Sequence, residues 1–254
     1  MNLDLSGKNA LVCGSTGGIG KAAAIELASL GATVTLLARN AEKLAATLRE
    51  LPGSGHDTVV ADLSSPETLE GLLPKRTWHI LINNTGGPTP GQAIDASVRD
   101  FETAFHTHLG SAQTLVKLLS PGMREAGYGR IINVISTSVK VPIYGLGVSN
   151  TIRGAMASWA KTLSLELGPH GITVNNVLPG STMTPRLQQI IDNRAEKSGK
   201  PADHVKAEMA AEVPLRRISE PHEVAAMIAF LASPAASYVN GTSIPVDGGR
   251  TGSI

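Results

Sequence analysis

The chain has 254 residues, of which 42% are hydrophobic, enough to build one large α/β core but short for two independent domains. Lys and Arg total 22 against 21 Asp and Glu, and a net charge of +1 provides no broad basic surface for nucleic acid or an anionic membrane. The single cysteine, Cys13, excludes an internal disulfide framework, and with no signal-like N-terminus or bilayer-length apolar run we expect one domain, residues 1–254, in the cytoplasm.

Short β-branched or Leu-rich runs alternate with longer segments of helical periodicity along almost the whole chain. The predicted strands are Asn9–Cys13, Thr33–Leu37, Thr58–Ala61, His79–Ile82, Arg130–Ile135, Thr173–Val177 and Ser243–Val246. This alternation predicts the α/β class: a Rossmann-type, doubly wound, seven-stranded parallel sheet in three layers, with helices on both faces.

Six segments between these strands carry apolar residues at helical spacing, and several end in glycine. They are Ile19–Leu30, Glu42–Leu51, Pro66–Leu73, Val98–Leu119, Ser149–Leu167 and Glu220–Leu231. The polar, charged stretch Ser181–Pro214 fits neither class and directly follows a strand end. It is therefore predicted to be a lid-like insertion, at about residues 181–214, over a site at the carboxyl edge of the sheet.

The strongest chemical signal is the run Cys13-Gly14-Ser15-Thr16-Gly17-Gly18-Ile19-Gly20, which leaves the first strand and enters the first helix. Glycines allow the backbone to approach a pyrophosphate closely, and the helix N-terminus attracts its negative charge. A tight strand-to-helix turn without any ligand is the alternative for this run taken alone.

With Cys13 in place of Thr, the run resembles the Thr-Gly-x-x-x-Gly-x-Gly motif of the short-chain dehydrogenase/reductase family. Further family landmarks follow in order: Asp62-Leu63, Asn83-Asn84-Thr85-Gly86 in place of Asn-Asn-Ala-Gly, Arg130 to Ser136, Val174 to Gly180 with Thr184, and Gly241 to Gly249. Each landmark alone also fits an ordinary cap or turn. The resemblance covers nearly the whole chain and implies a cofactor site formed by Gly14, Ser15, Thr16, Gly18, Ile19, Gly20, Arg39, Asp62, Leu63, Asn84, Thr85, Gly86, Arg153, Pro179, Gly180 and Thr184.

The residues after the second strand bear on cofactor choice. An acidic residue there would bind the unmodified ribose of NAD, but this chain has Arg39 and no neighbouring acid. A guanidinium suits a 2′-phosphate, which predicts NADP(H). The alternative, in which Arg39 is simply solvated and Asn40 or Ser15 carries a ribose hydroxyl, would allow NAD.

The catalytic positions depart from the family, in which an active-site Ser is followed by a Tyr and then by a Lys four residues later. If Ser136 is that Ser, the ungapped Tyr and Lys positions are occupied by Ser149 and Arg153, and the helix Asn position by Thr107. The nearby Tyr144 is followed four residues later by Val148 and does not restore the motif. The pattern resembles a divergent subgroup of β-ketoacyl carrier-protein reductase-like proteins.

These replacements change the expected chemistry. A Ser hydroxyl is a far weaker acid than a phenol, so Ser136 and Ser149 are expected to polarise a substrate carbonyl, while Arg153 holds the nicotinamide ribose. The remaining proton-donor candidates each fit better as solvated, surface or packing residues: Lys140, Tyr144, His106 and His108.

Two functions stay open at this point. The first is an NADP(H)-dependent oxidoreductase with an atypical catalytic site, acting on a small-molecule carbonyl or secondary alcohol. The second is an NADP-binding, catalytically inactive relative with a regulatory or structural role. A Rossmann-like domain for another nucleotide, such as a sugar nucleotide, is the remaining alternative. Met183 and Leu187 are candidates for an apolar substrate pocket. No His/Cys spacing suggests a zinc site. The two long helices Val98–Leu119 and Ser149–Leu167 carry more apolar residues than one buried face needs, which predicts a homotetramer or homodimer.

Overall fold

The computed structural model describes residues 1–253 and contains a seven-stranded, fully parallel sheet with the strand order β3-β2-β1-β4-β5-β6-β7. The strands are β1 Asn9–Cys13, β2 Thr33–Ala38, β3 Asp57–Val60, β4 Ile80–Asn83, β5 Gly129–Val134, β6 Ile172–Pro179 and β7 Ser243–Val246. The order reverses between β1 and β4, the switch point at which open α/β sheets bind ligands at the carboxyl ends of their strands. The predicted Rossmann-type fold is confirmed.

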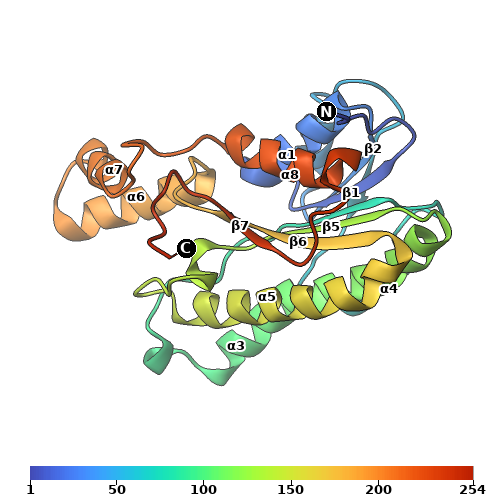
Figure 1. Ribbon diagram of the computed structural model, residues 1–254. Helices are drawn as coiled ribbons and strands as arrows, with labels where there is room; N and C mark the ends of the chain where they lie inside the picture. The colour runs from blue at the N-terminus through green and yellow to red at the C-terminus, as the bar shows by residue number, and fades with distance from the viewer. Residues whose placement is uncertain (254) are drawn as a thin grey trace.

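Helices cover both faces of the sheet (Figure 1). Along β1, Ala10 and Val12 pack in one apolar cluster with α1 (Gly18–Ser29), α2 (Ala41–Leu48) and α8 (Pro221–Ala232). Leu11 and Cys13 point the other way, into a cluster with α4 (Ser111–Glu125) and α5 (Gly147–Leu167). Continuous apolar runs such as β1 are explained by this two-sided burial, because every side chain of the strand meets a helix layer.

Side-chain amides join four neighbouring strands inside the sheet. Asn83 Nδ2 donates to Asn133 Oδ1 (2.8 Å), Asn133 Nδ2 donates to Asn176 Oδ1 (2.9 Å), and Asn176 Nδ2 donates to Ser243 Oγ (3.0 Å). Asn133 is fully buried, and the flanking asparagines are nearly so. This amide ladder connects the edge strand β7 to the end of β4.

Two predicted helices differ from the structure. Pro66–Leu73 forms only a 3-10 turn at Pro66–Thr68, since Gly71 and Pro74 follow within one to two turns and discourage continuation. The predicted helix Val98–Leu119 is instead α3 (Val98–Phe105) and α4, joined by a π-helical turn at His106–Gly110. One extra residue in that turn rotates the side chains that follow it, which affects the site described below.

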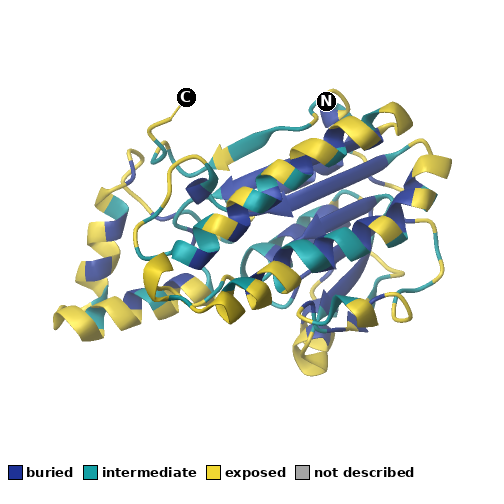
Figure 2. Cartoon of the chain, turned by 90° about the horizontal axis from the view of Figure 1, so that it is seen from below, coloured by how far each residue is buried: buried dark blue, intermediate teal, exposed yellow. Residues whose placement is uncertain are grey.

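The segment predicted as a lid folds into α6 (Pro185–Ser198) and α7 (Ala202–Ala211). The two helices project beyond the sheet beside β6 in Figure 1, and most of their outward surface is exposed in Figure 2. Their inner faces and Ile218, from the segment after α7, form a small apolar cluster separate from the main core, made of Leu187, Ile191, Val205, Met209 and Ile218. No helix within residues 1–253 has the length and apolar character needed to cross a bilayer.

Candidate functional site

The glycine-rich turn lies between β1 and α1, pressed against the end of β4. Gly14 adopts φ +57°, and a Cβ there would lie 2.6 Å from the Asn84 carbonyl oxygen. Asn84 Nδ2 in turn donates to the carbonyl oxygens of Cys13 (3.3 Å) and Gly14 (3.2 Å). At Gly20 a Cβ would lie 2.3 Å from the Gly14 carbonyl oxygen. The glycine-rich turn and the segment after β4 are therefore packed together, and no side chain larger than hydrogen fits at Gly14 or Gly20.

The N-terminus of α1 is open on its outer side. Its N-cap, Gly17, provides no capping side chain, the first turn has no acidic residue, and a Cβ on Gly17 would meet no atom within 4 Å. A Cβ on Gly18 would lie 2.9 Å from Thr184 Cγ2, so the segment after β6 borders the same turn. Uncapped N–H groups at the positive end of a helix can donate hydrogen bonds to a phosphate.

At the end of β2, two of the three groups considered for ribose recognition make hydrogen bonds within the chain. Ser15 is fully buried and donates its hydroxyl to the Leu37 carbonyl (3.4 Å), while Asn40 caps α2 by accepting from Lys43 N (2.8 Å). The side chain of Arg39 is 78% exposed, with Nη1 3.8 Å from Asp62 Oδ2. The exposed guanidinium of Arg39 is therefore the charged group available to a ligand here.

Asp62 follows β3 and faces Arg39. Its carboxylate accepts hydrogen bonds from the Ser64 backbone N–H (2.9 Å) and hydroxyl (2.8 Å). The backbone hydrogen bond, followed by the Ser64 hydroxyl and the Arg39 charge, lowers the pKa of Asp62 below its ordinary value, although partial burial opposes this. The residue is ionised at neutral pH, close to the position predicted to hold a phosphate.

Ser136 lies just beyond β5 and is half-buried. The Ser138 backbone N–H donates to Ser136 Oγ at 3.1 Å, so the Ser136 hydroxyl proton remains free to be donated elsewhere. Ser149, also half-buried, lies in the first turn of α5. The start of this helix is held by Gly147 N, which donates to Gly91 O (2.9 Å) on the loop after β4.

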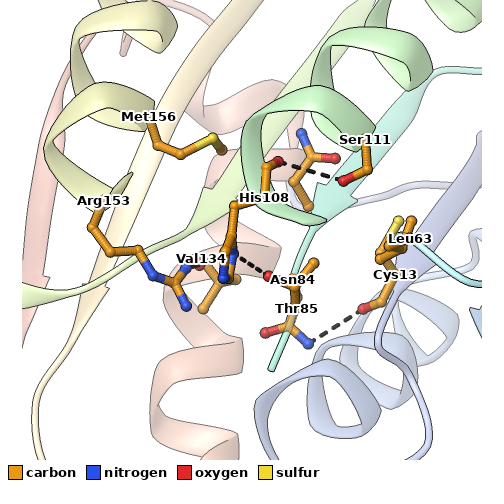
Figure 3. A pocket seen from close by; sticks show the side chains of 10 residues that line it. Cys13, Leu63, Asn84, Thr85, His108, Ser111, Val134, Arg153 and Met156 are labelled. Carbon is orange, nitrogen blue, oxygen red and sulfur yellow. Dashed lines mark hydrogen bonds between the residues drawn. The ribbon is translucent and has the colours of Figure 1, made fainter. Parts of the chain in front are cut away.

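Arg153, one helical turn after Ser149, is 7% exposed and donates through Nη1 to the Val134 carbonyl oxygen (2.9 Å). Burial lowers its pKa to about 10, which leaves the guanidinium charged at neutral pH. It borders a cavity of about 10 Å³, roughly the volume of one water probe. Figure 3 shows this cavity, lined by Cys13, Leu63, Asn83, Asn84, Thr85, His108, Ser111, Val134, Arg153 and Met156.

The structure corrects the interpretation of the long helix before β5. Thr107, expected at the helix Asn position, donates its hydroxyl to the Thr103 carbonyl (2.8 Å) and does not line the cavity. The neighbouring His108 does: it is 4% exposed, not a surface residue, and Nδ1 hydrogen-bonds to Thr85 Oγ1. Periodicity cannot reveal the π-helical turn that rotates His108 inward, so sequence reasoning missed it. Burial, followed by the charge of Arg153, lowers the pKa of His108 to about 3.

The other donor candidates lie on the surface. His106 and Lys140 are exposed, and Tyr144 is 89% exposed. Met183 and Leu187, candidates for a substrate pocket, instead belong to the lid cluster: Leu187 is buried within it and Met183 packs against it.

The remaining predicted positions border the same edge of the sheet. Pro179 ends β6, and a Cβ on Gly180 would lie 2.7 Å from Asp247 Cβ, beyond β7. Thr16 and Ile19 are half-buried in the glycine turn, while a Cβ on Gly86 would meet no atom within 4 Å.

Helix α6 contacts the loop that follows β4. Arg186, in the first turn of α6, donates through Nη2 to the Pro88 carbonyl oxygen at 2.9 Å. This contact connects the segments on either side of the predicted site. Within residues 1–253, no group of three or more His, Cys, Asp or Glu side chains is arranged to hold a metal ion.

Comparison with known proteins gives matches across almost the whole chain. A family model described as Enoyl-(Acyl carrier protein) reductase matches residues 14–251. The uncharacterized oxidoreductase MT0954 of Mycobacterium tuberculosis is 32% identical over 97% of this chain and 93% of its own length. The NADPH-dependent reductase BacG of Bacillus subtilis is 29% identical over 98% and 100%.

A solved structure has the same fold over its full length. L-sorbose reductase from Gluconobacter frateurii, complexed with NADPH and L-sorbose, superposes with a TM-score of 0.93 at 29% identity, covering 100% of both chains. Together with the glycine turn, the sheet order and the family match over residues 14–251, this similarity establishes that the chain belongs to the short-chain dehydrogenase/reductase family.

Proposed function

We propose that this chain is an NADP(H)-dependent oxidoreductase that interconverts a carbonyl and a secondary alcohol at an atypical catalytic site. The cofactor supplies the hydride when it is bound. The relative named NADPH-dependent reductase and the NADPH-bound structural neighbour support this assignment. The residues assigned to the carbonyl oxygen, Ser136 and Ser149, differ from the family pattern, in which a Tyr follows the Ser.

The observation that carries the cofactor assignment is the exposed guanidinium of Arg39 at the same edge of the sheet as an uncapped helix N-terminus. Pyrophosphate would be held by the N–H groups at the start of α1, and the 2′-phosphate by Arg39. Ser15 is buried with its hydroxyl bonded to Leu37, and Asn40 Oδ1 caps α2, so the NAD alternative depends on the Asn40 Nδ2 group alone.

Ser136 and Ser149 would bind the substrate oxygen. Ser136 accepts from the Ser138 N–H and keeps its own proton for donation, which suits a hydroxyl that must stabilise developing negative charge. Arg153 would hold the nicotinamide ribose as a permanent cation with donors beyond its contact with Val134. The lid formed by α6 and α7 would cover the bound substrate, with Arg186 anchoring it to the loop at Pro88.

The test combines a cofactor titration with a panel of carbonyl substrates. NADPH should bind more tightly than NADH, and NADPH absorbance should fall when a suitable ketone is added. Failure to bind either dinucleotide would refute the proposed function.

A specific observation favours the alternative, an inactive NADP-binding protein. The ionisable side chains that line the cavity have pKa values of about 3 (His108), 10 (Arg153) and 12 (Cys13), the last raised by burial. None of these side chains exchanges a proton easily near pH 7. Tight NADPH binding with no hydride transfer to any carbonyl would support this second function.

A further inference from the structure

The cavity contains a pair of side chains that the family pattern does not predict. Thr85 stands where the resembled motif has Ala, and His108 reaches the cavity through the π-helical turn. These two side chains hydrogen-bond to each other through Thr85 Oγ1 and His108 Nδ1. Together they link the end of β4 to the start of α4.

His108 also faces the cation of the site. Both His108 and Arg153 line the cavity, and in Figure 3 the imidazole lies between Thr85 and the guanidinium. No Asp or Glu lies among the cavity-lining residues, so Arg153 has no counter-charge there. Of its donors, Nη1 is directed to Val134 O, and the imidazole is the nearby side chain that offers a nitrogen lone pair.

This surrounding charge selects one tautomer. If Thr85 donated to Nδ1, the imidazole would carry its hydrogen on Nε2. That N–H would then point at the Arg153 guanidinium, which has only donors, so neither group could accept a hydrogen bond from the other. The reverse arrangement places the hydrogen on Nδ1, with Thr85 Oγ1 accepting, and turns the Nε2 lone pair to the guanidinium. The Thr85 hydroxyl proton is then free to be donated into the site.

We propose that His108 is a positioning residue of the cofactor site, whose neutral imidazole is fixed by Thr85 at Nδ1 and holds the Arg153 guanidinium through Nε2. The proposal rests on the proposed function, because Arg153 is the residue taken to bind the nicotinamide ribose. Without the imidazole, the Arg153 guanidinium would keep only its hydrogen bond to Val134 O, and no lone pair would orient its remaining donors. The consequence is weaker cofactor binding without any direct contact between His108 and the cofactor.

The first test measures NADPH dissociation constants by fluorescence titration. His108→Ala should raise the constant roughly tenfold, the typical effect of one hydrogen bond to a charged group. His106→Ala is the matched control, since His106 lies in the same turn but is exposed, and it should leave the constant unchanged. An affinity for His108→Ala within twofold of that control would overturn the proposal.

A second variant guards against simple misfolding. His108→Asn fills most of the space and keeps a hydrogen bond to Thr85, but is too short to reach the guanidinium, so it should fold normally and still lose NADPH affinity. The double variant His108→Ala/Thr85→Val should raise the dissociation constant by less than the two single effects combined, because each substitution breaks the same hydrogen bond. Fully additive effects on the dissociation constant would contradict the proposed link.

The third test uses imidazole NMR, with the His108 signal assigned by its loss in His108→Asn. The signal should show the Nδ1–H tautomer and stay neutral at pH 5, and Arg153→Met should raise its pKa. The ionisable groups that line the cavity with it are Arg153 from α5 and Cys13 from β1. A pKa unaffected by Arg153→Met would refute the contact. Neither affinity nor NMR requires turnover, so an inactive wild type would refute the proposed function while these tests still decide the role of His108.

Discussion

Replacing Arg39 by Ala tests the cofactor assignment most directly. A hydrogen bond between charged groups contributes about 1.5–3 kcal/mol, which corresponds to roughly a 10- to 150-fold change in affinity. The side chain is 78% exposed and shares its charge with Asp62 at 3.8 Å, so solvent screening places the expected loss for NADPH near the lower limit, roughly tenfold. NADH, which lacks the 2′-phosphate, should bind almost as before.

Calorimetric titration with both dinucleotides measures this difference. Arg49→Ala is the control, because Arg49 is an exposed arginine at the other end of α2 and removes the same net charge. Raising the salt concentration should weaken wild-type NADPH binding more than binding to Arg39→Ala. Equal wild-type affinities for NADPH and NADH, or equal losses for both dinucleotides in Arg39→Ala, would refute the argument.

Four other predictions follow from the site and the helices around it. Ser136→Ala should lower the rate of carbonyl reduction on the order of 10²-fold with cofactor affinity intact, whereas Arg153→Ala should mainly raise the NADPH dissociation constant, as steady-state kinetics and titration would show. The double variant Ser149→Tyr/Arg153→Lys should reduce simple ketones faster than wild type in a spectrophotometric assay, because a phenol beside a cation is a workable acid. The folded pKa of His108 is about 3 against an ordinary 6.5, so the unfolded chain alone gains this proton as pH falls below 6.5. Urea unfolding should show stability lost toward pH 3, by at most about 1.4 kcal/mol per pH unit from this group, and His108→Asn should lose less; equal losses would contradict the assignment. The exposed apolar residues Val98, Phe105 and Leu165 support a homodimer or homotetramer, and light scattering that finds only a 26.3 kDa particle would refute it.

The fold was predictable because strand burial leaves a direct pattern in the chain. All seven strands were predicted within two residues at each end, since two-sided burial gives short apolar runs such as Asn9–Cys13. The helices were predicted less completely. The segment Pro66–Leu73 is too short to form a helix when Gly71 and Pro74 disfavour its continuation. The π-helical turn at His106–Gly110 inserts one residue into a helical pattern that looks continuous in the sequence.

Within the site, residues that depend on backbone shape were predicted better than residues that depend on side-chain direction. The glycine turn and Thr184 converge as expected, because only glycine fits at Gly14 and Gly20. Motif spacing could not show that Ser15 would bond inward to Leu37, or that His108 would lie in the cavity while Thr107 would not. Those outcomes depend on the local backbone conformation, which decides the direction of each side chain and leaves no pattern in the sequence.

The amide ladder gives strand pairing a specificity that apolar packing alone does not provide. A one-residue slip of β6 would turn Asn176 to the other face and leave the buried Asn133 amide on β5 and the Ser243 hydroxyl on β7 without their partners, at about 1–3 kcal/mol for the buried amide. Apolar neighbours such as Val177 tolerate approximate placement, whereas an amide accepts only a partner at hydrogen-bond distance. Since Asn83, at the far end, lines the cavity, the register of the outermost strand is coupled to the alignment of the residues around Arg153. Removing the Ser243 hydroxyl would therefore disturb a site three strands away.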